Sequence, residues 1–327
     1  MKRILILGGT SFIGRTIVNR LTAIPQFDLT LFNRQQTNVE LFPNVKRLKG
    51  DRESDDIQAI GQHEYDLVID ISCYFPSSLQ TVLEHLKIEP ESYIFISTCS
   101  VYENSDLGLI RRDENASILS CTPEQAISRD DSTYGQRKAE CERTLKQSGL
   151  NHVIFRPALV FGPYDPTDRF YFWLYQVERN AILLLPEGGK RRFSITYVHD
   201  LADLVVKSLS MKLGSGVYNA ISKPEVSIGE IVETASKLLD KHPVSIDARY
   251  DFLQGQKIRE WSDMPLWIHG DHFTYSNTKA KSELNFAPTS LSNAMSTTIE
   301  YYSKLDWPPP KFGMSEKRRL ELITELS

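Results

Sequence analysis

The sequence predicts the α/β fold class, with a parallel, doubly wound sheet followed by a smaller, mainly C-terminal α+β domain. Two observations predict it. Through the first half of the chain, short apolar runs that suit buried strands alternate with helical patterns. The first apolar run ends in a glycine-rich turn that leads directly into a helical pattern, as at the start of a Rossmann sheet.

The composition is that of an ordinary soluble protein. Of the 327 residues, 41% are apolar and 24% are charged, and the formal net charge is −4. No apolar run approaches the roughly eighteen residues of a membrane span. Because the first predicted strand begins near residue 3, we expect no leader segment and a cytoplasmic location. The negative net charge argues against nucleic acid as a partner.

The cysteines show no C-x-x-C spacing. They are interpreted as isolated, reduced thiols rather than as a disulfide or zinc framework, so no metal site is expected. The residues concerned are Cys73, Cys99, Cys121 and Cys141.

Residues 2–21 carry the predicted start of a dinucleotide-binding unit. The apolar residues 4–7 suit a buried parallel strand, and residues 11–21 have the apolar spacing of a helix packed on a sheet. Glycines between them let the backbone approach a pyrophosphate, which the unpaired N–H groups of a helix start can bind. Gly14 fits the last glycine of the fingerprint, whereas Ser11 stands where a middle glycine is usual. The predicted cofactor contacts here are Gly8, Gly9, Thr10, Ser11, Phe12, Ile13 and Gly14.

The end of the second predicted strand, residues 29–32, selects the dinucleotide. An Asp or Glu there would hydrogen-bond the ribose of NAD, but residues 29–36 contain neither. Arg34, which follows Asn33, could instead pair with the 2′-phosphate of NADP. The sequence therefore favours NADP, with NAD as the alternative, and adds Asn33 and Arg34 to the cofactor contacts.

Three further strands and two helical segments complete the predicted nucleotide-binding half. Asp51 and Arg52 follow the first of these strands and Ser72 follows the second, at the sheet edge where ligands bind. These three residues are therefore predicted cofactor contacts, with Asp51 facing the adenine ring. The strands cover residues 45–48, 67–71 and 93–96, and the helical segments cover residues 55–60 and 78–86.

The residues that could carry chemistry are Thr98, Tyr134 and Lys138. Thr98 comes directly after Ser97 at the carboxyl end of strand 93–96. Tyr134 and Lys138 are four residues apart, so on a helix they share one face and can reach one ligand. A neighbouring ammonium favours the phenolate, so we expect Lys138 to lower the pKa of Tyr134. Such a tyrosine can transfer a proton to or from a carbinol oxygen.

The second half of the chain is predicted to divide between the sheet and a substrate-binding cap. The nucleotide-binding domain comprises residues 1–163, to which residues 193–221 return, and the cap comprises residues 164–192 and 222–327. Within the returning part, residues 194–198 are expected to add a strand to the nucleotide-binding sheet.

Aromatic residues are concentrated in the cap. The run at residues 170–177 is interpreted as core against the sheet rather than as a base-stacking platform, because helical spacing hides about half of its faces. Trp261, Trp267 and Phe273 lie on long arms that could close a cleft between cap and sheet, where we expect the substrate.

Six motifs occur in the order in which the extended short-chain dehydrogenase/reductases carry them. Through these motifs the chain resembles that family, which contains the NAD-dependent epimerase/dehydratase domain. The motifs are GGTSFIG at residues 8–14, GD at 50–51, STCSVY at 97–102, YGQRK at 134–138, RPALVFGP at 156–163 and YVHDLAD at 197–203. The tail is most similar to an atypical, mostly bacterial epimerase or reductase branch related to chloroplast stem-loop-binding proteins. It carries MPLWI at residues 264–268, SNTKA at 276–280 and WPPPKFGMSEKRRLELI at 307–323.

The resemblance implies a mechanism and the residues that perform it. Tyr134 would transfer the proton, Lys138 would contact the cofactor ribose and tune the tyrosine, and Thr98 would orient the substrate. The nicotinamide would exchange a hydride with the substrate carbon. Pro157 and Val160 would lie near the nicotinamide, in a stretch where this chain has a phenylalanine instead of the usual tyrosine.

Departures from the family pattern narrow the reaction. Family dehydratases carry an Asp-Glu pair after the threonine, but this chain has Cys99-Ser100, which disfavours a dehydratase. Many nucleotide-sugar epimerases carry an Arg-Asp pair where this chain has Phe193-Ser194. Arg191 and Arg192 lie just upstream but out of register, so the sequence gives no support to a nucleotide-sugar substrate.

The sequence thus predicts an NAD(P)-dependent oxidoreductase or epimerase that acts on a carbonyl or secondary alcohol of a small-molecule substrate. The alternative is a non-catalytic protein of the same fold that senses a nucleotide or binds RNA. A homodimer through the helix that carries Tyr134 is expected by analogy with the family.

Overall fold

The largest element of the fold is a seven-stranded sheet of order β10-β6-β5-β4-β1-β2-β3, in which the paired strands are parallel. The computed structural model describes residues 1–103, 111–211, 213–269 and 273–326. The strand order reverses beside β1, whose neighbours are β2 and β4. This is the topology of a Rossmann sheet, which opens a ligand crevice at the carboxyl ends of these strands and confirms the predicted fold class. The strands are β1 (Lys2–Leu7), β2 (Phe27–Asn33), β3 (Lys46–Lys49), β4 (Leu67–Asp70), β5 (Ser92–Ile96), β6 (His152–Pro157) and β10 (Gly216–Ala220).

Alternate residues of β1 face opposite sides of the sheet and belong to two hydrophobic clusters. Ile4 and Ile6 share a cluster with residues of α1 and α6, whereas Leu5 and Leu7 share one with residues of α2 and α4. Helices therefore cover both faces, which explains why the strands are continuous apolar runs. The helices are α1 (Phe12–Leu21), α2 (Pro76–His85), α4 (Tyr134–Gln147) and α6 (Val198–Ser210), and the 3-10 segment η1 (Asp55–Gln62) adds to the second cluster.

The segment expected to return to this sheet does so only in part. Strand β10 joins the sheet and α6 packs on it, but β9 (Arg192–Tyr197) pairs with β7 (Leu159–Phe161) and β11 (Lys223–Ser227) in a separate three-stranded sheet. The prediction that residues 194–198 extend the nucleotide-binding sheet is therefore wrong. Strand β10 occupies the edge beside β6, and the apolar side chains of β9 are buried in the core of the cap instead.

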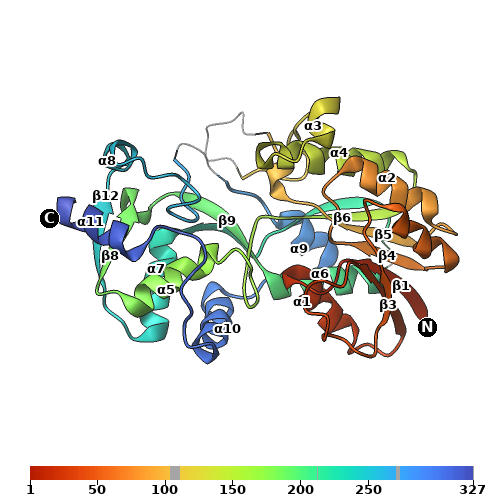
Figure 1. Cartoon of the computed structure of the whole chain (residues 1–327), viewed down its shortest axis with the longest axis horizontal. Coiled ribbons are helices and arrows are strands. Elements are labelled where there is room, and N and C mark those ends of the chain that lie inside the picture. The colour runs from red at the N-terminus through yellow and green to blue at the C-terminus, as the bar shows by residue number, and fades with distance from the viewer. Residues whose placement is uncertain (104–110, 212, 270–272, 327) are drawn as a thin grey trace.

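Part of the predicted cap range also packs on the nucleotide-binding half. Helix α9 (Thr278–Leu284) contacts α6 and β10, and Ala280, Leu284 and Phe286 belong to the same cluster as Ile4. Figure 1 shows α9 beside α6 and β6, away from the other C-terminal helices. Within the predicted cap range of residues 222–327, the segment around α9 therefore lies on the nucleotide-binding half and not with the rest of the cap.

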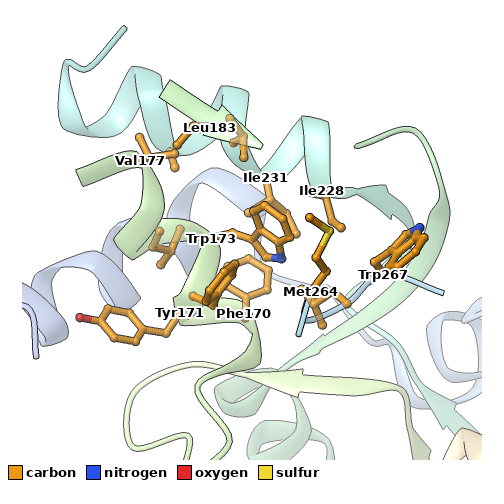
Figure 2. Close-up of a cluster of buried hydrophobic side chains, with 14 of the residues drawn as sticks. Phe170, Tyr171, Trp173, Val177, Leu183, Ile228, Ile231, Met264 and Trp267 are labelled. Atoms are coloured by element: carbon orange, nitrogen blue, oxygen red, sulfur yellow. The ribbon is translucent and has the colours of Figure 1, made fainter. Parts of the chain in front are cut away.

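The cap has its own core around the aromatic helix α5 (Arg169–Arg179). Figure 2 shows Trp173 in this cluster near Ile231 and Met264, and the Trp173 indole N–H donates to the Pro265 carbonyl at 2.7 Å. The aromatic run is thus core, as expected, although it is the core of the cap. The remaining elements are β8 (Ile182–Pro186), β12 (Val244–Ala248), α3 (Pro123–Ile127), α7 (Ile228–Leu239), α8 (Tyr250–Gly255), α10 (Leu291–Lys304), α11 (Glu316–Leu326), η2 (Cys99–Val101), η3 (Asp131–Thr133) and η4 (Glu187–Gly189).

A buried ion pair holds α4 against the sheet. The side chains of Glu142 and Arg156 are 0% and 2% exposed, and two N–H groups of the guanidinium donate to the two carboxylate oxygens at 2.8 and 2.5 Å. Ser97, which follows β5, donates its hydroxyl to the same carboxylate at 2.6 Å. Burial alone would raise the pKa of Glu142, but Arg156 and Ser97 keep it below its usual value. These contacts fix α4 relative to the ends of β5 and β6, where ligands bind.

Glu142→Gln is expected to lower the free energy of unfolding by about 3–5 kcal/mol, because it leaves the Arg156 guanidinium buried without a counter-charge. Urea denaturation measures the change. The matched control is Glu140→Gln on the same helix, where the lost partner of Arg143 is partly exposed and about 1 kcal/mol or less is expected. Equal losses for the two variants would contradict the role given to the buried pair.

Candidate functional site

The turn after β1 brings backbone to the mouth of the crevice. Gly8 and Gly9 have φ values of +111° and +102°, a region that L side chains rarely adopt. A Cβ atom on Gly14 would lie 2.8 Å from the nitrogen and the Cα atom of Gly9, so the turn and the start of α1 are in direct contact. Ser11 precedes α1 without a side-chain capping hydrogen bond, which leaves first-turn N–H groups available to an anion. This geometry fits the pyrophosphate of a dinucleotide.

One cavity of about 1540 Å³ begins at this turn and is lined by the carboxyl ends of several strands and by the cap. Lys138 and Pro157, both within the described ranges, are not among its lining residues. The predicted site residues that do line it are Gly8, Gly9, Thr10, Ser11, Phe12, Ile13, Gly14, Asn33, Arg34, Asp51, Arg52, Ser72, Thr98, Tyr134 and Val160.

At the end of β2, Asn33 supports the glycine turn and Arg34 stays exposed. The Asn33 amide donates to the Gly8 carbonyl at 2.9 Å. The Arg34 guanidinium lies 4.0 Å from the Asp51 carboxylate, and both side chains are more than two-fifths exposed. Such a loose pair costs little to open, so Arg34 remains free to turn toward an anion in the cavity.

Arg52 has a structural partner that the sequence did not indicate. Its guanidinium donates to both carboxylate oxygens of Asp70, at 2.6 and 2.9 Å, and the Tyr93 hydroxyl donates to the same carboxylate at 2.8 Å. Asp70 is fully buried, so its charge needs this arginine. Arg52 lines the cavity, but its charge is already balanced, which weakens the case for the predicted cofactor contact.

Three hydroxyl groups meet where β5 ends against α4. Thr98 donates its hydroxyl to Ser100 Oγ at 3.2 Å and accepts from the Ser100 N–H at 3.1 Å. Tyr134, the first residue of α4, lies beside them in the cavity wall, close enough for Thr98 to influence its pKa. Gly135 permits this approach, because a Cβ atom there would overlap the Ser100 carbonyl. The predicted pair of Thr98 and Tyr134 is therefore together in the cavity wall.

Lys138 lies one turn deeper on the same helix. Its ammonium donates to the carbonyl oxygens of Cys73 at 2.9 Å and Ile96 at 2.7 Å, and it lies 4.1 Å from the centre of the Phe95 ring. These bonds tie α4 to the segments that follow β4 and β5. The resemblance implies that Lys138 contacts the cofactor ribose. That contact would have to use the N–H group of the ammonium that is not engaged in these two bonds.

The pKa of Tyr134 does not follow the expectation. Burial raises the pKa of Tyr134 to about 12, and Thr98 offsets this only in part. The expected lowering by Lys138 is absent in this structure, because that ammonium is directed at two backbone carbonyls. At neutral pH the Tyr134 hydroxyl is therefore protonated and can act as a proton donor.

Several residues of the cavity wall were not predicted, and they come from both the nucleotide-binding half and the cap. Burial raises the pKa of one of them, Asp165, to about 6. Asp165 and Arg169 directly follow the RPALVFGP motif, so extending that motif would have found them. Of the aromatic residues predicted on the cap arms, Trp261 and Phe273 line the cavity, whereas Trp267 is buried and donates to Glu187 at 2.8 Å. The unpredicted lining residues include Tyr74, Arg129, Asp131, Arg137, Asp165, Thr167, Arg169 and Glu260.

The described ranges contain neither a membrane-spanning helix nor a metal-binding cluster. No helix there is long and apolar enough to cross a membrane, and no cluster of three or more His, Cys, Asp or Glu side chains there could hold a metal ion.

The sheet order, the glycine turn and the cavity at the reversal of strand order define the class of doubly wound Rossmann proteins. The model of the NAD dependent epimerase/dehydratase family matches residues 4–220. The chain therefore belongs to that family, which confirms the resemblance drawn from the sequence.

Individual relatives are more distant. Over 254 residues the chain is 26% identical to the chloroplast stem-loop binding protein of 41 kDa b of Arabidopsis thaliana, covering 72% of this chain but only 63% of that relative. It is 22% identical to the N-acetyl-alpha-D-glucosaminyl-diphospho-ditrans,octacis-undecaprenol 4-epimerase of Escherichia coli O157:H7, covering 91% and 94% of the two chains. The solved UDP-glucuronic acid 4-epimerase of Bacillus cereus, in complex with NAD, superposes with a TM-score of 0.70 at 20% identity. That superposition covers 94% of this chain and 100% of the other, and it shows a shared fold.

Gly14→Ala is expected to lower the free energy of unfolding by about 1–3 kcal/mol, because the added methyl group would collide with the Gly9 backbone. Urea denaturation measures the loss. Gly255→Ala is the control: it ends helix α8 with nothing within 4 Å of the added atom, so no loss is expected. A Gly14→Ala protein as stable as the control would refute the close contact between turn and helix.

Proposed function

We propose that the chain is an NAD(P)-dependent oxidoreductase or epimerase of the extended short-chain dehydrogenase/reductase type. Its substrate is a small molecule with a carbonyl or secondary alcohol. The observation that carries the proposal is that Tyr134 and Thr98 lie together in the wall of the same cavity that begins at the glycine turn. The printed names of the Escherichia coli and Bacillus cereus proteins, both 4-epimerases, support an epimerase.

The residues of the turn would hold the dinucleotide. The close contact of Gly9 and Gly14 leaves room for a pyrophosphate, and the first-turn N–H groups of α1 would bind it. Ser72, whose hydroxyl donates to the Leu7 carbonyl at 3.2 Å, would lie under the cofactor at the reversal of strand order. When bound, the nicotinamide accepts a hydride from the substrate carbon or returns one to it.

The proton is moved by this chain. Tyr134, which is protonated at neutral pH, donates to the substrate oxygen as that oxygen gains negative charge, and Thr98 keeps the tyrosine hydroxyl and the substrate in register. Lys138 acts as a positioning residue, because its bonds to Cys73 and Ile96 hold α4 in place. A reductase needs only this proton donation. An epimerase also needs its reverse, in which Tyr134 accepts the hydroxyl proton as the substrate alcohol is oxidised to a carbonyl.

The RNA-binding alternative has less support. It rests on the printed name of the Arabidopsis relative, of which this chain covers 63%. The net charge is −4, and phosphate contacts to nucleic acid need clustered lysine and arginine side chains. Oxidoreduction or epimerisation therefore remains the proposal.

The cofactor preference depends on Arg34. Because β2 ends without a carboxylate, we expect NADPH to bind more tightly than NADH, and we expect Arg34→Gln to reduce that preference about tenfold, the loss of one charge-assisted contact. Fluorescence titration of both reduced cofactors measures it. Arg20→Gln is the control, since Arg20 pairs with Asp203 outside the cavity wall. Tighter binding of NADH, unchanged in Arg34→Gln, would instead assign the cofactor to NAD.

Tyr134→Phe is expected to reduce turnover by about a hundredfold or more, the scale of general acid–base catalysis. The absorbance change of the nicotinamide, followed on the first carbonyl substrate found by screening, measures turnover. Tyr65→Phe is the control, because its hydroxyl is buried without a hydrogen-bond partner and lies outside the cavity wall. Turnover of Tyr134→Phe close to that of the control would rule out the proposed role.

A further inference from the structure

Five arginines line the cavity, and four of them are already engaged. Arg34, Arg52 and Arg129 pair with carboxylates, and Arg137 donates to two backbone carbonyls. The guanidinium of Arg169 makes neither a hydrogen bond nor an ion pair within the part of the chain that the structure describes. Since the proposed function assigns Arg34 to the cofactor, Arg169 is the cation of the cavity wall that is left for the substrate.

Arg169 is partly buried, so the absence of a paired carboxylate reduces the stability of the protein. Burial lowers the pKa of this guanidinium, and the nearest acids, Asp165 and Asp131, oppose that effect without pairing with it. Asp165 accepts two hydrogen bonds from Thr167, at 2.9 and 2.8 Å, both at the same carboxylate oxygen, Oδ1. A partly buried charge without a partner destabilises the protein unless a ligand anion completes it.

Trp261 supports the guanidinium from one side. The central carbon of Arg169 lies 4.7 Å from the centre of a Trp261 ring, so the two form a cation–π contact. Trp261 holds a φ of +64°, which is strained for a bulky residue, and its N–H donates to the Trp267 carbonyl at 3.0 Å. Strain of this kind persists where the surrounding structure holds it and is concentrated at ligand sites.

We propose that Arg169, seated on Trp261, binds an anionic group of the substrate, either a phosphate or a carboxylate. The inference rests on the proposed function and names the class of its substrate. A guanidinium stacked on an aromatic ring keeps its edge free for two parallel hydrogen bonds to an oxyanion. Asp131, whose charge acts on Arg169, lines the same cavity and lies three residues before Tyr134. Arg169 therefore lies near Tyr134, and an anion bound to Arg169 would lie on the cap side, near the reacting end of the cavity.

Two other arginines lie next to Phe193-Ser194, where many nucleotide-sugar epimerases carry an Arg-Asp pair. Neither of them is available to bind an anion in the cavity. Arg191 pairs with Glu187 at 3.0 Å and Arg192 pairs with Glu230 at 3.3 Å. Neither belongs to the cavity wall. Within the described residues, Arg169 is therefore the guanidinium on the cap side that faces the substrate space without a partner.

The test measures binding to the full chain, with and without the dinucleotide it binds, of glucose 1-phosphate, glucuronate and neutral glucose. Arg169→Gln is expected to weaken binding of the anions about tenfold to a hundredfold, and Arg169→Lys, which keeps the charge but loses the fork, should lie between. Glucose should show no dependence on Arg169. Calorimetry reports the affinities, and tryptophan fluorescence, compared with Trp261→Phe, reports contact with the stacked pair.

Arg179→Gln is the matched control, because it removes an exposed arginine from the other end of the same helix. A loss confined to glucose 1-phosphate assigns the subsite to phosphate, and a loss confined to glucuronate assigns it to carboxylate. Equal effects in Arg169→Gln and Arg179→Gln, or no binding of either anion to the unmodified chain at millimolar concentration, would overturn the inference. Thermal shifts with dinucleotide, measured on the same proteins, report separately whether the proposed function fails.

Discussion

The candidate site depends on the ion pair between Glu142 and Arg156, because it decides where α4 lies on the sheet. Tyr134, Lys138 and Glu142 are spaced four residues apart and share one helix face. Glu142 reaches Ser97 and Arg156, Lys138 reaches the carbonyls that follow β4 and β5, and Tyr134 reaches the cavity. The buried end of this helix face is therefore anchored to the sheet, and its other end carries the Tyr134 hydroxyl at the cavity. The contacts of Lys138 and Glu142, one and two turns further along α4, fix the position of that hydroxyl.

The burial that fixes this geometry also sets the proton affinity of the site. Lys138 lies behind the cavity wall and Arg52 lines it. The donors of Lys138 are engaged by two carbonyls, and the charge of Arg52 is engaged by Asp70. None of these charges is therefore spare to stabilise a phenolate, and burial raises the pKa of Tyr134. The tyrosine is preset as an acid. Its use as a base requires additional positive charge near the hydroxyl, brought by whatever fills the cavity.

Local pattern explains what could be predicted from the sequence. The apolar run of β1 and the glycines beside α1 act within a few residues, and the strand and the turn form where they were predicted. The spacing of Tyr134 and Lys138 puts both on one face of α4, but only Tyr134 lines the cavity. The direction of the Lys138 ammonium was not predictable, because its partner Cys73 lies 65 residues away. The same holds for β9, whose apolar side chains suit either sheet and whose place is decided by β7 and β11. Arg169 and Trp261 meet only through the folding of the cap.

The cavity walls differ in how much of their charge is already paired. On the nucleotide-binding side Arg52 is paired with a buried acid, and the Thr98 hydroxyl donates to the Ser100 hydroxyl. On the cap side the Arg169 guanidinium has no hydrogen-bond or ion-pair partner within the described residues, and the strained backbone of Trp261 donates its N–H to the Trp267 carbonyl. Side chains whose charges and hydrogen bonds are already paired keep the reacting groups in one arrangement. A charged side chain without a partner favours a ligand that carries the opposite charge. Substrate choice in this fold can therefore change through the cap while the proton-transfer geometry stays fixed by α4.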